Sequence, residues 1–248
     1  MKKKYGGILT LLLLGILFWW PKNQVMELGD VTIRNKMFYS VIHCNKTGQN
    51  MKVPRVYSSD CLDLNGDGTD ELGLIHWKFP RGRMVKILSL KEEVDVVYED
   101  DLSQIKPWKI QFGDVTGNGI GEIALGVVKE TPLHPVMAKR CFFYNLDFQE
   151  KRLVPRYRAS RFCRPFTDFI LLDMDGDGIC EVISMEKDRE EGMVLAGYQW
   201  HGFGFFVSYE RPGEKTDKSL EKRSGKLFVD GKEIPLKDET WKKKEVKR

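Results

Sequence analysis

The sequence contains no motif that is typical of a common enzyme class. It has no G-x-S-x-G or H-E-x-x-H pattern, and no glycine-rich loop of the kind that cradles phosphate groups. Its four histidines lie far apart in the chain and share no motif. The sequence therefore gives no support to a serine hydrolase, a zinc protease or a phosphate-cradling enzyme.

Cysteine is scarce and forms no metal-binding pattern. The chain has five cysteines, with no C-x-x-C pair and no Cys/His cluster of the kind that binds zinc. Two interpretations are open: two disulfides of unknown pairing with one remaining thiol, or buried unpaired thiols throughout. The cysteines are Cys44, Cys61, Cys141, Cys163 and Cys180.

The first 22 residues lack any acidic residue. They consist of a lysine cluster, an apolar stretch from Gly6 to Trp20, and then Pro21 and Lys22, an order typical of an export signal. No small-x-small cleavage site follows, and the first cysteine is Cys44, too far along for lipoprotein-type acylation. Residues 1–22 are therefore interpreted as an uncleaved signal anchor. A cleaved signal peptide is the alternative, because the apolar stretch from Gly6 to Trp20 is shorter than the about 17–25 residues that usually span a bilayer.

This interpretation determines the expected localisation and excludes one class of partner. The chain after the anchor is expected outside the cytoplasm, attached to the membrane or, if the segment is cleaved, secreted. Beyond Lys22 the charges balance, with 36 basic and 36 acidic residues. A balanced charge gives no support to nucleic-acid binding.

No stretch shows a sustained helical period, whereas short β-type runs are frequent. They are four to eight residues long, rich in β-branched and aromatic residues, and bounded by Gly, Pro, Asp or charged pairs. Asp230-Gly231 between two apolar runs predicts a hairpin, whereas residues 214–225 are polar and are expected to form a long excursion. With 42% hydrophobic residues, the chain is expected to form a packed all-β domain.

Three acidic stretches recur along the chain: "DLNGDGTDE" (63–71), "DVTGNGIGE" (114–122) and "DMDGDGICE" (173–181). Their starts are 51 and 59 residues apart, a period that accommodates about four short strands per repeat. We therefore expect a small β-propeller-like domain of about four four-stranded units over residues 23–240, followed by a basic tail over 241–248. A β-sandwich with decorated loops is the competing architecture.

The acidic stretches have the composition of calcium-binding loops. Oxygen-bearing side chains stand at positions 1, 3, 5 and 9, and glycines at positions 4 and 6 allow a tight turn. An EF-hand is excluded, because its loop needs a glutamate at position 12 and flanking helices, whereas position 12 here is Leu74, Leu125 or Ser184. The candidate ligands are Asp63, Asn65, Asp67, Glu71, Asp114, Thr116, Asn118, Glu122, Asp173, Asp175, Asp177 and Glu181.

The alternative is that these loops are Asp-Gly turns whose side chains cap their own backbone without an ion. Three loops in register favour calcium, with two or three structural Ca²⁺ sites. The middle loop is expected to be the weakest or empty, because Thr116 and Asn118 replace carboxylates there.

Loops of this form, following an apolar strand and repeating every fifty-odd residues, resemble the FG-GAP/VCBS repeats of integrin α-chain-like β-propellers. The stretch "YQWHGFGF" (198–205) is similar to an aromatic strand that often accompanies them. The resemblance covers about residues 55–210 and implies that the residues at positions 1, 3, 5 and 9 are calcium ligands. It also implies a propeller-type fold.

These features predict a non-enzymatic role. We expect a membrane-attached, extracytoplasmic, calcium-stabilised repeat protein that binds a ligand or acts as a scaffold in the cell envelope, with an envelope protein or a glycan as partner. The rival hypothesis is an envelope enzyme acting on polysaccharide on the same scaffold, and a purely structural envelope protein is a third. The identity of the ligand is not encoded in any feature of the sequence.

Overall fold

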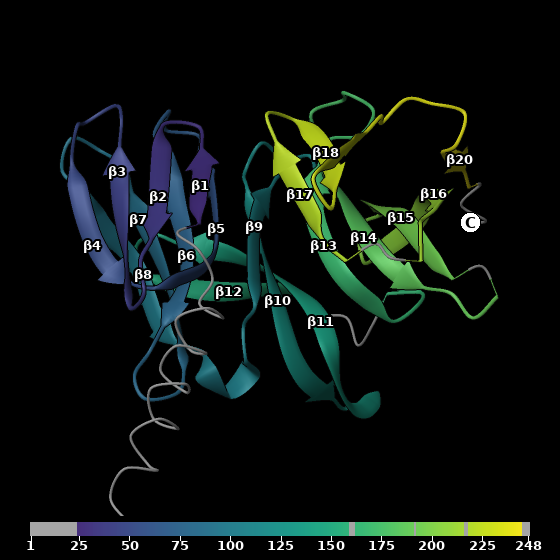
Figure 1. Cartoon of the computed structure of the whole chain (residues 1–248), viewed down its shortest axis with the longest axis horizontal. Helices are drawn as coiled ribbons and strands as arrows, with labels where there is room; N and C mark the ends of the chain where they lie inside the picture. The colour runs from purple at the N-terminus through teal and green to yellow at the C-terminus, as the bar shows by residue number, and fades with distance from the viewer. Residues whose placement is uncertain (1–23, 159–161, 191, 216–217, 245–248) are drawn as a thin grey trace, which may run out of the picture. The chain divides into compact units, whose positions relative to one another are not determined.

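The computed structural model describes residues 24–158, 162–190, 192–215 and 218–244 (Figure 1). Within these residues the chain is built from β-strands, and the single helical element is a short 3₁₀ turn, η1 (Ser103–Ile105). The predicted all-β class is confirmed. No helix in this part of the chain is long and apolar enough to cross a bilayer. The predicted anchor, residues 1–22, lies outside the described residues.

The chain divides into two compact units, with the boundary between Arg55 and Val56. In the first unit, four antiparallel strands form one sheet in chain order. Its second strand alternates as expected of a sheet with one buried face: Val31 and Ile33 are fully buried, whereas Arg34 is exposed. The strands are β1 (Val25–Leu28), β2 (Val31–Asn35), β3 (Tyr39–Cys44) and β4 (Asn50–Pro54).

The second unit contains four further antiparallel sheets, each built from consecutive strands except that β20 joins the edge of the third. The first comprises β5 (Val56–Leu62), β6 (Glu71–Trp77), β7 (Arg83–Ser89) and β8 (Asp95–Asp101). The second comprises β9 (Lys109–Gly113), β10 (Glu122–Thr131), β11 (His134–Asp147) and β12 (Arg152–Arg158). The third comprises β13 (Phe166–Leu172), β14 (Glu181–Lys187), β15 (Met193–Trp200), β16 (Phe205–Pro212) and the short β20 (Lys242–Lys243). The fourth comprises β17 (Leu220–Arg223), β18 (Lys226–Val229) and β19 (Lys232–Ile234).

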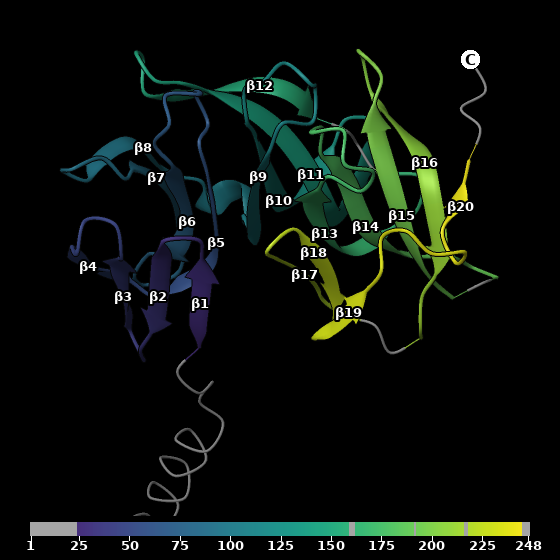
Figure 2. The same ribbon diagram turned by 90° about the horizontal axis from the view of Figure 1, so that it is seen from above.

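The sheets of the second unit are arranged like the blades of a β-propeller. Their first strands are neighbours: β9 lies beside β5 and β13, and β13 lies beside β17. Figure 2 shows these strands towards the middle of the unit, with β8, β12 and β16 at its periphery. This arrangement buries the face of each sheet against the next and leaves only short edges exposed.

Apolar clusters fill the spaces between neighbouring sheets. Ile75 and Ile87 of the first sheet pack with Phe112 and Leu125 of the second. Close packing requires a glycine at one point, because a Cβ on Gly73 would lie 2.3 Å from the Phe112 ring. Two further clusters join the second sheet to the third and the third to the fourth.

The number of units differs from the prediction. The described residues form five sheets, one in the first unit and four in the second, rather than about four units of four strands. The additional sheet includes β17, which falls within the segment expected to be a polar excursion. Its four residues are too few to show a strand pattern in the sequence, although Leu220 is buried. The hairpin at Asp230-Gly231 is confirmed, with φ of 47° and 82° at these two residues.

The predicted basic tail also contributes to the fold. Lys242 and Lys243 form the edge strand β20, which pairs with Glu210 and Tyr209 of β16. The Lys244 ammonium lies 2.6 Å from the Glu210 carboxylate. Strand pairing and this ion pair therefore order the tail as far as Lys244. All five cysteines are free thiols in the structure, but only Cys44 and Cys141 are buried, whereas Cys61 and Cys180 are half-buried and Cys163 is exposed.

Candidate metal centre

The three acidic loops occupy equivalent positions in three sheets. Each connects the first strand of its sheet to the second: β5 to β6, β9 to β10 and β13 to β14. The loops also lie side by side, because the Cys180 N–H of the third donates to the Asp114 carbonyl of the second at 2.7 Å, and Gly121 of the second abuts Leu64 of the first. Their flanking strands agree with the exclusion of an EF-hand.

The aspartate at position 1 organises each loop. In the third loop, Asp173 Oδ1 accepts the N–H of Gly176 at 2.6 Å, and Oδ2 accepts the N–H of Gly178 at 2.9 Å. Asp63 and Asp114 make the same pair of bonds to the glycines at positions 4 and 6. All six glycines have φ between 73° and 88°, a backbone conformation that is unfavourable for residues with a Cβ atom. The repeated glycines predicted this tight turn correctly.

The side-chain oxygen at position 3 accepts the N–H of position 5 in the first and third loops. The side-chain oxygen at position 5 accepts the N–H of position 7 in every loop, from Thr69, Ile120 or Ile179. These are the capping bonds expected of Asp-Gly turns. A carboxylate oxygen that accepts one N–H keeps a second lone pair, so the capping bonds do not prevent these oxygens from binding a cation.

The third loop brings three carboxylates together. Oxygens of Asp173, Asp175 and Asp177 lie within 4.8 Å of one another, and this is the one such acidic cluster in the part of the chain that the structure describes. Asp175 and Asp177 are exposed, so solvent reaches the cluster. The Tyr209 hydroxyl donates to Asp175 Oδ2 at 3.1 Å. Burial and this bond raise the pKa of Tyr209 to about 12, which keeps the donor proton in place.

The glutamates at position 9 make contacts that the sequence did not predict. Glu71, Glu122 and Glu181 are almost completely buried. In each, Oε2 accepts the N–H of position 2 at 2.8–2.9 Å. Oε1 accepts a side-chain donor, which is Ser89 Oγ, Thr116 Oγ1 or Gln199 Nε2. Each glutamate therefore fastens the start of its loop to its end.

Burial raises the pKa of these glutamates above the usual range, although the hydrogen bonds that they accept act in the opposite direction. A cation would favour their ionised form. Their role as ligands stays a prediction. Thr116 donates its hydroxyl proton to Glu122, so the middle loop uses one of its expected neutral ligands for an internal contact.

Electrostatic surroundings distinguish the first loop from the third. Lys91 Nζ lies 3.3 Å from Asp67 Oδ2, and the pKa of Asp67 is lowered mainly by the N–H of Thr69, with help from Lys91. Among the described residues, no lysine or arginine forms an ion pair with the three aspartates of the third loop. Lys237 is nearby, with Nζ 3.8 Å from the Cβ position of Gly176. Ion pairs therefore compensate the negative charge of the third loop less than that of the first.

The oxygen atoms of these loops fit a hard cation. Calcium takes six to eight oxygen ligands in flexible geometry, whereas magnesium requires near-ideal octahedral geometry and retains water. The third loop offers three carboxylates in reach of one another. The first loop offers Asp63, Asn65 and Asp67, with Lys91 as a competing cation.

A buried polar cluster near the inner strands was missed by sequence reasoning. Asp60 of β5 accepts the N–H of Phe112 at 2.8 Å and the Lys222 ammonium at 3.1 Å. Asp168 of β13 accepts the Leu220 N–H at 2.7 Å and Lys109 Nζ at 2.7 Å. Because every carboxylate has donors from another sheet, the cluster joins the blades. The only sequence signal was an acidic residue within each of the two segments that form β5 and β13.

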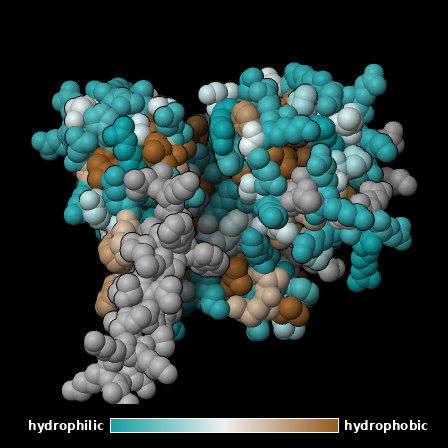
Figure 3. Space-filling model, viewed as in Figure 1, coloured by the Kyte–Doolittle hydropathy of each residue, from teal (hydrophilic) through white to brown (hydrophobic). Residues whose placement is uncertain are grey.

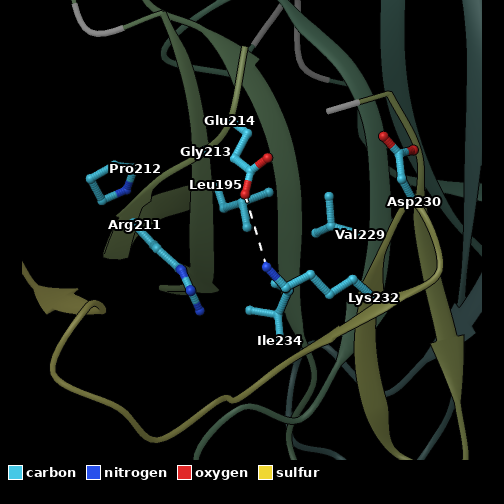
Figure 4. Close-up of a pocket in the computed structure, with 9 residues that line it drawn as sticks. All are labelled: Leu195, Arg211, Pro212, Gly213, Glu214, Val229, Asp230, Lys232 and Ile234. Atoms are coloured by element: carbon cyan, nitrogen blue, oxygen red, sulfur yellow. Dashed lines mark ion pairs between the residues drawn. The ribbon is translucent and has the colours of Figure 1, made fainter. Parts of the chain in front are cut away.

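Residues of β18 and β19 line two cavities of the second unit. One of about 430 Å³ adjoins the third loop and is lined by Asp173, Gly176, Glu233 and Lys237 among others. The other, of about 330 Å³, lies over Leu195, Val229 and Ile234 (Figure 4). Its charged groups have partners within the protein: Lys232 lies 4.0 Å from Glu214, and Arg211 lies 3.4 Å from Asp238. Neither cavity contains an arrangement typical of a known catalytic site.

No protein-family model matches the chain, and no curated protein matches its sequence. The resemblance to FG-GAP/VCBS repeats therefore remains a hypothesis that depends on the loop residues.

Proposed function

We propose that this chain is an extracytoplasmic, membrane-attached calcium-binding protein of FG-GAP/VCBS type, which presents a rigid set of loops to a partner in the cell envelope. The observation that supports it most is the convergence of Asp173, Asp175 and Asp177 within 4.8 Å without a cationic side chain paired to them. Three like charges so close together repel one another, and a bound divalent cation removes that repulsion.

The proposed role of the ion is structural. Extracellular calcium modules typically have dissociation constants of about 10⁻⁴–10⁻³ M. At about 1 mM calcium, a site of 10⁻⁴ M stabilises the folded state by about 1.4 kcal/mol. That is a substantial part of a typical stability of about 5–15 kcal/mol. Calcium would thus fix the shape of loops that a partner contacts.

The structure offers no specific observation in favour of the polysaccharide-acting enzyme. Such an enzyme usually needs a carboxylic acid with a raised pKa at a substrate cavity. The glutamates whose pKa is raised are each buried and hydrogen-bonded, and none lines either cavity described above. They are Glu71, Glu122, Glu181 and Glu186.

Thermal unfolding tests the proposal. We expect calcium to raise the melting temperature of the purified chain by about 3–6 °C per site relative to a chelator, and magnesium to have little effect. Asp177→Asn keeps the Oδ1 acceptor for the Ile179 N–H but removes a charge, so it should lose much of the gain. Glu150→Gln, which removes an exposed charge in the turn between β11 and β12, is the control. Equal melting temperatures in calcium and chelator would refute the proposal.

The partner class is tested separately. Retention of the chain on cell-wall glycan or on an envelope protein, without turnover, supports a binding module. Release of soluble sugar from the same glycan would favour the enzyme instead.

A further inference from the structure

The turn between β15 and β16 places aromatic side chains at the surface. Phe203 is 79% exposed, and His201 is exposed as well. The rings of both residues contact the half-buried Phe206 ring, with centroids 5.7 and 5.4 Å apart. We call these three side chains the aromatic patch. Single exposed apolar side chains are normal on a protein surface, but neighbouring ones indicate a contact site.

The backbone of the turn is held by its own hydrogen bonds. The His201 N–H donates to the Gly204 carbonyl at 2.9 Å, and the Phe203 N–H donates to the His201 carbonyl at 2.9 Å. Phe205, in the same hairpin, packs on the Tyr157 ring with centroids 5.4 Å apart and contacts the apolar cluster between the second and third sheets. The patch is therefore held in place before any ligand arrives, which lowers the entropic cost of binding.

The aromatic patch adjoins the third acidic loop. Phe206 pairs with Gln199 of β15, and Gln199 Nε2 donates to Glu181 Oε1 of that loop at 2.9 Å. Further along β16, the Tyr209 hydroxyl donates to Asp175 of the same loop at 3.1 Å. A partner of the third loop would therefore also lie close to the patch.

The patch combines apolar ring faces with an available polar group. The ring nitrogens of His201 have no hydrogen-bond partner among the described residues. A pyranose sugar has the complementary features, because it carries C–H bonds on its faces and hydroxyl groups around its edge. The C–H face packs on an aromatic ring, and the hydroxyl groups exchange hydrogen bonds with an imidazole.

The shape of the patch favours a small ring over a broad surface. The Phe206 ring is inclined at 85° to the rings of both Phe203 and His201. The three rings therefore form a corner rather than a flat platform, which suits a ring-sized group. A stable protein interface needs about 1,200–2,000 Å² of buried surface, far more than three side chains provide.

Charge argues against a lipid surface as the partner. No lysine or arginine occurs between Val194 and Glu210. This part of the hairpin thus has no basic residue that anionic headgroups would attract. A neutral partner is the one that fits.

We propose that the aromatic patch binds a neutral glycan, with the C–H face of one pyranose ring stacked on Phe203 and its hydroxyl groups hydrogen-bonded to His201. Chains of β-1,4-linked glucose or N-acetylglucosamine present such faces, because their ring substituents are equatorial. The proposal rests on the proposed function in taking a glycan as the partner, but it does not depend on calcium binding.

Ligand-observed NMR titration of the purified full chain with chitohexaose and with cellohexaose tests the proposal. We expect the wild type to bind, and Phe203→Ala to lose at least about fivefold in affinity. Phe203→Trp should keep the affinity because it restores an aromatic face, whereas His201→Ala should weaken it. Phe79→Ala is the matched control, because Phe79 is also 79% exposed and lies in a turn of the same unit; it should bind as the wild type does.

A second control removes an aliphatic side chain. Figure 3 shows hydrophobic residues at the end of the β10–β11 hairpin, where Leu133 is 90% exposed, and Leu133→Ala should also bind as the wild type does. The proposal is overturned if neither sugar binds, if both controls lose as much affinity as Phe203→Ala, or if the chain instead binds phosphatidylcholine vesicles through Phe203. A chain that is stabilised by calcium but binds neither sugar would overturn this proposal alone and leave the proposed role of calcium intact.

Discussion

Single charges near the loops decide how strongly each would attract a cation.

The glutamates at position 9 illustrate which contacts of single residues cannot be inferred from the sequence. Their spacing predicted that they belong to the loops, but their donors Ser89 and Gln199 lie 18 residues away. Only the folded sheet brings such residues together, so the hydrogen bonds that hold Glu71 and Glu181 could not be inferred from the loop motif.

Lys91 is expected to weaken cation binding in the first loop. Its ammonium lies 3.3 Å from Asp67 and competes with a cation for that carboxylate, although solvent screens an exposed pair of this kind. Lys91→Met should therefore raise the calcium affinity of the first loop by up to about fivefold, measured by calorimetric titration. Lys78→Met, which removes a lysine paired with Asp101, should leave the affinity unchanged. An equal effect of both variants would show that only net charge matters.

Arg164 contacts two glutamates whose pKa values move in opposite directions. Burial raises the pKa of Glu186, despite hydrogen bonds from Tyr198, Ser184 and Arg164. Burial also acts on Glu210, but hydrogen bonds from Lys244 and Arg164 outweigh it and lower the pKa. The two side chains therefore serve as controls for each other.

The signs of the pH effects follow from linkage. The contribution of Glu186 to stability is complete below its unfolded-state pKa and is lost as pH rises through its raised folded-state pKa. As the pH rises from the unfolded-state pKa of Glu186 to its folded-state pKa, Glu186→Gln should therefore gain stability relative to the wild type. Glu210 contributes above its unfolded-state pKa and loses this contribution as pH falls through its lowered pKa, so Glu210→Gln should be destabilised at neutral pH and approach the wild type in acid. Denaturant unfolding across pH measures both, and curves of the same sign would contradict the assignment.

At the scale of elements, each loop behaves as a closed turn held by its own aspartate and glutamate. Strand positions were largely predictable, because apolar runs, glycines and acidic turns alternate regularly in the sequence. β20 was not, since Lys242 and Lys243 have no strand-like pattern and pair only because the edge of β16 is available. The length of the β10–β11 hairpin was also not predictable, because its pairing continues to Thr131 and His134, past the end of its pairing with β9 at Gly126.

The fastening role of the position-9 glutamate is testable without any metal. In the presence of a chelator, Glu71→Ala should lower the free energy of unfolding by about 1–3 kcal/mol, because the buried Leu64 N–H loses its acceptor. Glu71→Gln keeps one acceptor oxygen and should cost less. Denaturant unfolding measures both variants. If neither differs from the wild type in chelator, the glutamate acts only as a ligand.

For the second unit as a whole, contacts near the inner strands join sheets that are distant in sequence. The repeat of acidic loops predicted a propeller-like arrangement, and the structure has one. The number of sheets was not predictable, because the β17–β19 sheet carries no acidic loop. It is connected to the rest partly by Lys222, which reaches Asp60 in the first sheet of the unit.

Lys222→Met should therefore destabilise the whole second unit. The change leaves the buried Asp60 carboxylate without its cation. We expect a loss of about 1–3 kcal/mol, below the 3–5 kcal/mol typical of a fully buried pair, because the Lys222 side chain is 25% exposed. Lys226→Met, which removes a solvent-exposed pair with Glu233 in the same sheet, should be nearly neutral. Equal losses in denaturant unfolding would argue against a bridging role.

Terbium luminescence tests the central claim, a divalent-cation site in the third loop, most directly. Terbium substitutes for calcium and emits when a nearby tyrosine is excited, and the Tyr209 hydroxyl lies 3.1 Å from Asp175 Oδ2. We predict sensitised emission that calcium displaces and magnesium does not, that falls in Tyr209→Phe, and that is lost in Asp177→Asn. Emission that is absent, or unchanged in both variants, would contradict the assignment of this loop.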